Sequence, residues 1–205
     1  MKQKPGRYFP ILGSIIFALL NFYSAHLYPG GTRSDPFSRG YDHFNNFWCD
    51  LLDPVAYGGV VNQGRPSALA ATLILPLSLI PFWFYLPVIF KNQSRKNLMI
   101  RVAGILSMLV ALMMPLMHDL ALNVSSGLLF VATGLAFIGL LQSREWKLVG
   151  AGILAGGFSL ANYLMWQTQY RLEWMPLVQK SAIASSLVWV VLVNRRYVEV
   201  LKTQK

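Results

Sequence analysis

Residues 67–90 read SALAATLILPLSLIPFWFYLPVIF, a run that contains no acidic residue, lysine or arginine. A second run of this kind covers residues 9–28. An α-helix rises about 1.5 Å per residue, so about 20 apolar residues cross a hydrocarbon core that is about 30 Å thick. Both runs therefore predict membrane-spanning helices, and the chain is expected to be an integral membrane protein.

Four more apolar segments follow, at residues 102–120, 125–141, 148–168 and 175–194. Inside lipid, only helices and closed barrels satisfy all their backbone hydrogen-bonding groups, and runs this long do not alternate as barrel strands do. A chain of 205 residues that is 55% hydrophobic has room for one bundle and little else. The predicted fold is all-α, a single membrane domain over residues 1–205 built as a six-transmembrane-helix bundle.

The net charge of +10 is unevenly distributed along the chain. Thirteen of the 18 basic residues lie before the first predicted span, between the second and third, between the fourth and fifth, or after the sixth. In a six-span protein these segments share one side of the membrane, and the positive-inside rule makes that side cytoplasmic. Both termini are therefore expected in the cytoplasm, with membrane lipids and not nucleic acid as the partners of the basic residues.

The first extracytoplasmic segment, residues 29–66, is long for so small a protein, and long ordered loops are often functional. Within it, the apolar residues at 44, 47, 48, 51 and 52 follow helical spacing, with polar residues on the opposite face. Pro54 ends this pattern. The pattern predicts a short extracytoplasmic amphipathic helix, which either contributes acidic residues to a polar site or only closes the bundle as a lid.

Only one acidic residue and one lysine fall inside predicted spans, Asp119 in the third and Lys180 in the sixth. A charged side chain in a membrane helix costs about 2.5–3.5 kcal/mol on insertion scales, so it usually faces the bundle interior or water. Asn123 would share the face of Asp119, whereas His118 would point elsewhere. These groups either satisfy one another or form an extracytoplasmic ligand site together with the loop. The predicted lining of that site is Asp50, Asp53, His118, Asp119, Asn123 and Lys180.

All three histidines, His26, His43 and His118, lie on the predicted extracytoplasmic side. Three imidazoles with a carboxylate can hold zinc, whose bound water becomes a nucleophile near neutral pH. No two of these histidines have a local ligand spacing, so a zinc site would require them to converge in space. Cys49 is the only cysteine, which excludes an intrachain disulfide and a multi-cysteine metal site.

The sequences YPGG at residues 28–31 and GYDHFNNFWCDLL at residues 40–52 resemble a bacterial membrane family. This is the domain-of-unknown-function 998 family, which is loosely grouped with the Frag/DRAM/Sfk membrane proteins. The resemblance implies six spans, a proline-glycine turn after the first span, and the bacterial inner membrane as the location. It implies no reaction. Cys49-Asp50 stands where such families often have serine-aspartate.

Three functions are compatible with these features. The leading hypothesis is binding of a lipid headgroup or another small amphiphile, without catalysis, at an extracytoplasmic polar site. The second is a metal-dependent membrane hydrolase that acts on a lipid amide or ester, by analogy with seven-span ceramidase-like hydrolases. The third is a small-molecule transporter, which would need a polar route through both leaflets.

Overall fold

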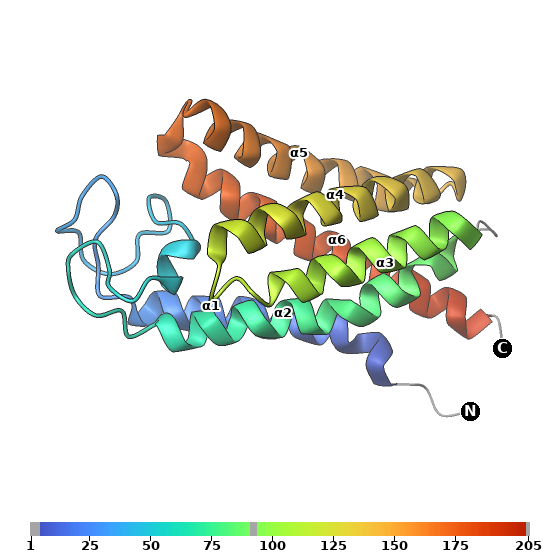
Figure 1. The fold of residues 1–205 in the computed structure, drawn as a ribbon, viewed down its shortest axis with the longest axis horizontal. Helices are drawn as coiled ribbons and strands as arrows, with labels where there is room; N and C mark the ends of the chain where they lie inside the picture. Colours follow the sequence, from blue (N-terminus) through green and yellow to red (C-terminus); the bar gives the residue numbers. More distant parts are fainter. Residues whose placement is uncertain (1–4, 91–93, 204–205) are drawn as a thin grey trace. The chain divides into compact units, whose positions relative to one another are not determined.

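The computed structural model describes residues 5–90 and 94–203, and these residues form six α-helices (Figure 1). Four short 3-10 segments accompany them, at Pro5–Tyr8, Cys49–Leu52, Leu86–Ile89 and Leu172–Trp174. The helices are α1 (Phe9–Leu27), α2 (Arg65–Tyr85), α3 (Ser94–Ala111), α4 (His118–Gln142), α5 (Trp146–Thr168) and α6 (Met175–Thr203). The all-α prediction is therefore confirmed.

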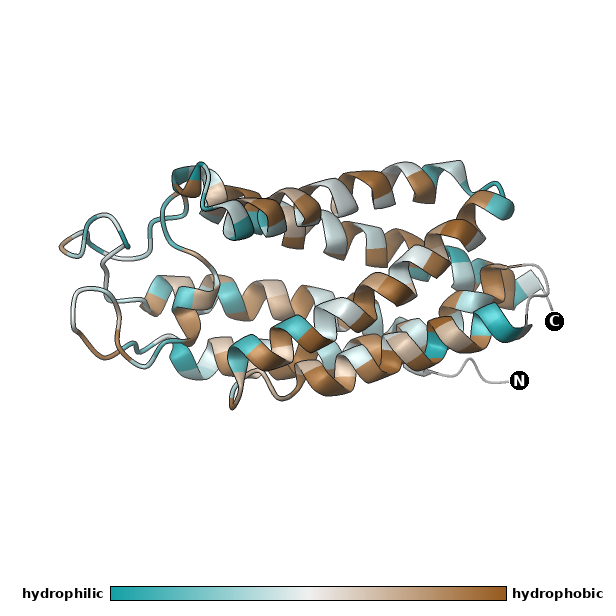
Figure 2. Cartoon of the chain, turned by 45° about the horizontal axis from the view of Figure 1, so that its top comes forward, coloured by the Kyte–Doolittle hydropathy of each residue, from teal (hydrophilic) through white to brown (hydrophobic). Residues whose placement is uncertain are grey.

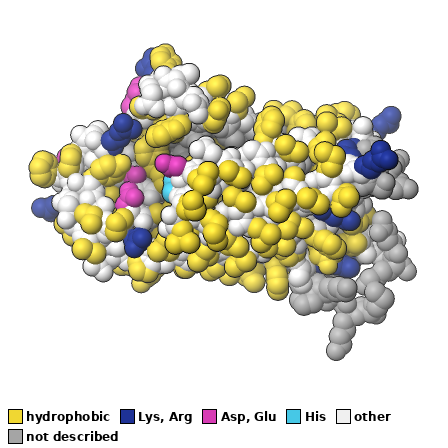
Figure 3. All heavy atoms as spheres, viewed as in Figure 1, with side chains coloured by type: hydrophobic (Ala, Val, Ile, Leu, Met, Phe, Trp, Pro, Cys, Tyr) yellow, Lys and Arg dark blue, Asp and Glu magenta, His cyan; other side chains and the backbone are white. Residues whose placement is uncertain are grey.

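Five helical segments are long and apolar enough to cross a membrane. They are Gly6–Leu27, Arg65–Ile89, His118–Gln142, Trp146–Thr168 and Leu172–Thr203. Large apolar side chains such as Leu19, Phe130 and Leu160 are exposed on these helices, and hydrophobic residues run along them (Figures 2 and 3). The chain is thus a multi-span helical membrane protein. The helix α3 is not among these five segments, because its 18 residues include Arg95, Lys96 and Arg101.

The predicted boundaries of the third and fourth spans are wrong. Residues 102–120 were expected to form one helix, but α3 ends at Ala111 and turns occupy residues 112–117. Pro115 explains the break, because it lacks a backbone N–H and disfavours helical geometry at the preceding residue. His118 and Asp119 consequently begin α4 instead of ending the third span. Asp119 lies in the first turn of α4, where the helix dipole favours a negative charge.

The chain divides into two compact units. Unit 1 contains residues 1–16, 72–152 and 188–205, and unit 2 contains residues 17–71 and 153–187. Unit 1 therefore holds α3 and α4 complete, whereas unit 2 holds the whole loop between α1 and α2. The residues of the predicted ligand site are divided between the two units.

Aromatic rings form the core of unit 1. Phe82 is fully buried and contacts Trp83, Trp189 and Tyr197 with ring centroids 5.1, 5.9 and 6.4 Å apart. The hydroxyl of Tyr197 donates a hydrogen bond of 3.1 Å to the carbonyl of Arg7. Because Arg7 precedes α1 and Tyr197 is near the end of α6, the two terminal segments of the described chain lie side by side.

The helices α3 and α4 pair in opposite directions. The hydroxyl of Ser107 donates to the carbonyl of Ser125 at 2.8 Å. At the other end of the pair, the Lys96 ammonium donates to Gln142 Oε1 at 2.6 Å. Just after this end of α4, Glu145 in the connection to α5 lies 2.7 Å from the Arg196 guanidinium of α6.

Gly104 of α3 allows this helix to lie close to Trp83. A Cβ atom added at Gly104 would lie 2.3 Å from the Trp83 ring, whereas one added at Gly134 of α4 would have nothing within 4 Å. Since Trp83 is buried, Gly104→Ala should overpack the core and lower the free energy of unfolding by about 1–3 kcal/mol. Gly134→Ala is the matched control and should have little effect. Thermal unfolding in detergent measures both variants, and equal stability would contradict this packing.

Candidate functional site

Residues 42–53 do not form the amphipathic helix that their apolar spacing predicts, so that prediction is wrong. Only Cys49–Leu52 makes a short 3-10 turn. Before it, the Asp42 carboxylate accepts hydrogen bonds from the backbone N–H groups of Phe44 and Asn45 at 2.8 and 3.2 Å. The Asn46 side chain accepts one from the Asp42 N–H at 3.0 Å. Such bonds compete with those of a helix, which is why the spacing alone misleads.

Part of the predicted apolar stripe still packs against α1. The Trp48 ring meets Phe17 and Phe22 edge to face, with centroids 5.6 and 6.4 Å apart. Leu51 is fully buried in a small core with Tyr28. Phe44, by contrast, is 69% exposed. The loop is therefore a packed element of unit 2, and it shares a small apolar core with α1 and α2.

Asp50 is buried among hydrogen-bond donors instead of facing water. One carboxylate oxygen, Oδ2, accepts from the Asn46 amide at 3.0 Å and from the Phe47 N–H at 2.8 Å. The other, Oδ1, has only a long contact of 3.5 Å with the Tyr57 hydroxyl. Asn46 is also buried and donates to the Gly31 carbonyl at 2.9 Å. Burial raises the pKa of the Asp50 carboxyl, and the two bonds to Oδ2 oppose this rise.

Lys180 and Gln179 of α6 connect the loop to that helix. The Lys180 ammonium donates to the carbonyls of Asn46 and Pro176, the latter at 3.3 Å, and lies 5.5 Å from the centre of the Tyr41 ring. Gln179 accepts from the Trp48 N–H at 3.0 Å. We call this group of residues the loop cluster, which consists of Asn46, Asp50, Tyr57, Gln179 and Lys180.

Two other acidic groups of the loop, the Cys49 thiol and the Tyr57 hydroxyl, have raised pKa values. Burial raises the pKa of the Cys49 thiol to about 11 and that of the Tyr57 hydroxyl to about 12, and the nearby Asp50 carboxylate adds to both effects. Both groups are therefore protonated at neutral pH. Asp50 is therefore the residue of the loop cluster whose side chain can carry a negative charge.

The six predicted ligand residues have different environments. Asp50 and Lys180 belong to one cluster, and Asp53 follows Asp50 at an exposed position. His118, Asp119 and Asn123 are exposed and lie in unit 1. His118 was expected to point away from Asp119, but its Nδ1 lies 2.9 Å from Asp119 Oδ1, so that expectation is wrong.

The three histidines have no shared ligand set. His43 packs against the rings of Tyr41 and Phe22, with centroids 5.1 and 6.3 Å away, and His26 is exposed in unit 2. Within residues 5–90 and 94–203, no three or more His, Cys, Asp or Glu side chains are grouped so that they could hold a metal ion. The described geometry therefore gives no support to the zinc hypothesis.

Sequence reasoning missed Asn46, Tyr57 and Gln179 as site residues. For Asn46 and Gln179, the sequence contains a signal that could have identified them. Asn46 precedes Asp50 by four residues, and Gln179 stands beside Lys180 in a largely apolar helix. Tyr57 has no such signal, because only the fold of the loop brings it to Asp50.

No known protein family, curated protein or solved structure matches this chain. The resemblance of loop 29–66 to the domain-of-unknown-function 998 family stays a prediction. Function is therefore inferred from the chemistry of the loop cluster.

If Lys180 holds the loop on α6, Lys180→Met should expose Cys49. A hydrogen bond to a charged group contributes about 1.5–3 kcal/mol, so the rate at which maleimide labels Cys49 in detergent should rise about tenfold or more. The exposed Lys147 provides the matched control, and Lys147→Met should leave the rate unchanged. Equal rates in Lys180→Met and the unmodified protein would show that Lys180 does not hold the loop.

Proposed function

We propose that the protein binds the polar headgroup of a membrane lipid, or of a similar small amphiphile, at the loop cluster without catalysing a reaction. One observation carries this proposal. Asp50 and Lys180 are opposite charges in one cluster, yet no ion pair within 4 Å joins Lys180 to any carboxylate of the described chain. Asp50 is buried and Lys180 is partly buried, and two such charges left apart can each take a partner of opposite sign.

Both charges have unused hydrogen-bonding capacity. An ammonium has three N–H donors, and the two carbonyls bonded to Lys180 use two of them. Asp50 Oδ1 has only its contact of 3.5 Å with Tyr57, whose side chain is 42% exposed. Movement of Tyr57 would open this oxygen to a ligand. A headgroup that carries a phosphate and an ammonium, such as phosphoethanolamine, matches Lys180 and Asp50 respectively.

The same chemistry favours binding over hydrolysis. The Cys49 thiol, the nucleophile nearest to Asp50 in sequence, has a pKa of about 11 and is therefore a poor nucleophile at neutral pH. The carboxylate that could assist it instead accepts two hydrogen bonds from the loop itself, at 3.0 and 2.8 Å. The cluster thus resembles a site that orients a ligand.

We also propose six membrane crossings, with α3 as one of them. The contact between Arg7 and Tyr197 brings the two terminal segments together, and this supports an even number of crossings. At 1.5 Å per residue, α3 is about 27 Å long, close to the thickness of the hydrocarbon core. The Arg101 guanidinium on α3 donates to the Phe84 carbonyl at 3.0 Å, which reduces the cost of a charge in this helix.

The distribution of charge supports cytoplasmic termini and an external loop 29–66. Among the described residues, unit 1 has nine Lys or Arg and three Asp or Glu, whereas unit 2 has five of each. Both terminal segments belong to unit 1 and loop 29–66 belongs to unit 2. The positive-inside rule therefore assigns the termini to the cytoplasm.

Two single-cysteine variants test this orientation. In a Cys49→Ser background, Ser34→Cys places a thiol on an exposed loop position and Thr203→Cys places one on the exposed end of α6. A membrane-impermeant maleimide applied to intact cells should label only the cysteine at position 34, and both should react after the cells are lysed. Labelling of position 203 in intact cells would overturn the orientation.

Headgroup binding can be measured through Cys49 itself. A lipid bound at the loop cluster stabilises the closed loop, so Cys49 in nanodiscs of phosphatidylethanolamine should be labelled more slowly than in phosphatidylglycerol with the same chains. A tenfold difference corresponds to about 1.4 kcal/mol of stabilisation by the ligand. Asp50→Asn should abolish the difference because it removes the charge that attracts the ammonium.

Glu173→Gln removes an exposed acidic residue of the same unit and is the matched control, which should keep the difference between the two lipids. The labelling rate of Asp50→Asn in detergent shows whether its loop is still closed. Equal labelling of the unmodified protein in both lipids would contradict headgroup binding at this site.

A further inference from the structure

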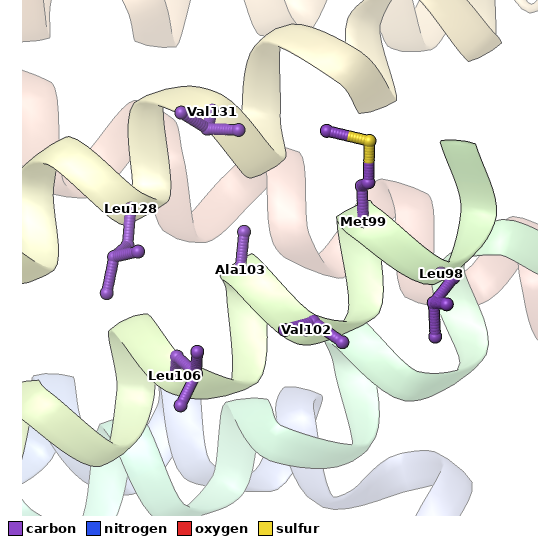
Figure 4. A pocket seen from close by; sticks show the side chains of 7 residues that line it. All are labelled: Leu98, Met99, Val102, Ala103, Leu106, Leu128 and Val131. Carbon is purple, nitrogen blue, oxygen red and sulfur yellow. The ribbon is translucent and has the colours of Figure 1, made fainter. Parts of the chain in front are cut away.

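An apolar groove of about 380 Å³ lies between α3 and α4 within unit 1 (Figure 4). Its α3 wall consists of Leu98, Met99, Val102, Ala103 and Leu106. The α4 wall consists of Leu128 and Val131. The small side chain of Ala103 projects toward α4 and leaves the middle of the groove open (Figure 4). This volume lies at the lower end of the roughly 300–1,000 Å³ typical of ligand sites.

A cation lies on the same face of α3 as most of the groove-lining residues, at the beginning of this helix. Four of the groove residues follow Arg95 at spacings of three, four, seven and eleven positions, which places them on the same helix face as Arg95. They are residues 98, 99, 102 and 106. Arg95 is exposed and begins this stripe one turn before Leu98 and Met99. An apolar groove with an arginine one helical turn beyond it has the chemistry of a lipid site, with hydrocarbon in the groove and a phosphate at the arginine.

Arg95 differs from the other two basic residues of α3. Lys96 donates to Gln142, and Arg101 donates to the Phe84 carbonyl and lies 5.2 Å from the centre of the Phe84 ring. Within the part of the chain that the structure describes, the Arg95 side chain makes no hydrogen bond or ion pair. Its guanidinium offers five N–H donors in a planar arrangement suited to phosphate.

We infer that this groove binds one anionic phospholipid of the cytoplasmic leaflet, with an acyl chain along Ala103 and its phosphate at Arg95. The orientation proposed above puts Arg95 on the cytoplasmic side, where anionic lipids are attracted by basic residues. The site uses none of the residues of the loop cluster. It would therefore give the protein a second, chemically different lipid contact.

A second copy of the chain fits the groove less well than a lipid. All copies share one orientation in the membrane, so a two-fold dimer through this face would bring the two Arg95 side chains toward each other. Like charges at an interface oppose association. A lipid supplies the complementary charge instead.

Native mass spectrometry of the full chain in a neutral detergent can test this inference, with phosphatidylglycerol and phosphatidylcholine of identical chains as probes. We expect the first phosphatidylglycerol to bind more tightly than phosphatidylcholine. One Lys or Arg near a membrane surface contributes about 1 kcal/mol to the attraction of anionic lipid, so Arg95→Gln should weaken phosphatidylglycerol binding about fivefold. Phosphatidylcholine binding should hardly change.

Arg195→Gln is the matched control, because Arg195 is also exposed and belongs to the same unit. An equal loss in Arg195→Gln would show diffuse attraction by the basic end of the protein and would overturn the specific site.

Ala103→Phe should fill the groove and weaken the binding of both lipids, and its thermal unfolding verifies that it is folded. A folded Ala103→Phe that binds both lipids normally, or a dimer that Ala103→Phe abolishes, would also overturn the inference. Asp50→Asn should leave phosphatidylglycerol binding intact, which separates this test from that of the loop cluster.

Discussion

Backbone N–H and C=O groups in the hydrocarbon core have no water to bond, and this constraint governs the whole architecture. An α-helix satisfies this constraint because its backbone N–H and C=O groups bond to one another within the same segment. Many polar side chains of the helices also bond back to the same helix, as Ser14 does to Pro10 at 2.7 Å and Thr133 does to Leu129 at 2.7 Å. Polar groups of this kind are already satisfied, so they do not point to a ligand. Lys180 is different, because its main partner lies in a distant loop.

The loop between α1 and α2, which we propose lies outside the membrane, has a different requirement: its buried backbone groups also need partners, and side chains supply them. Among the described residues it has only two isolated β-bridges, so no strand ladder supports it. Asn62 instead donates to the carbonyls of Leu51 and Asp53, each at 3.0 Å, and accepts from the Gly64 N–H. Asn46 and Asp50 perform the same task nearer α6. Amides and carboxylates therefore shape this loop, and the same residues create its charged cluster.

The two proposed lipid contacts use different physical properties. The loop cluster offers charges of both signs, which can discriminate between headgroups but gives no length of apolar surface. The groove offers an apolar wall and a single cation, which favours a hydrocarbon chain with an anionic group. Specificity in the first comes from the pairing of charges that are otherwise costly to bury. In the second it comes from an exposed arginine at the end of an apolar surface.

The sequence alone determined the class of the protein, its all-α fold and the approximate positions of α1, α2, α5 and α6. These features depend on apolar content and length, which add up locally along the chain. Only the tertiary structure decided the irregular path of residues 42–53 and the partners of Lys180. The partners of Lys180 have no local cause in the sequence, because Lys180 bonds to a carbonyl 134 residues away. The path of residues 42–53 is irregular because side chains such as Asp42 form hydrogen bonds that compete with the helix favoured by the apolar spacing. No periodicity in a single sequence records which distant group will supply such a bond.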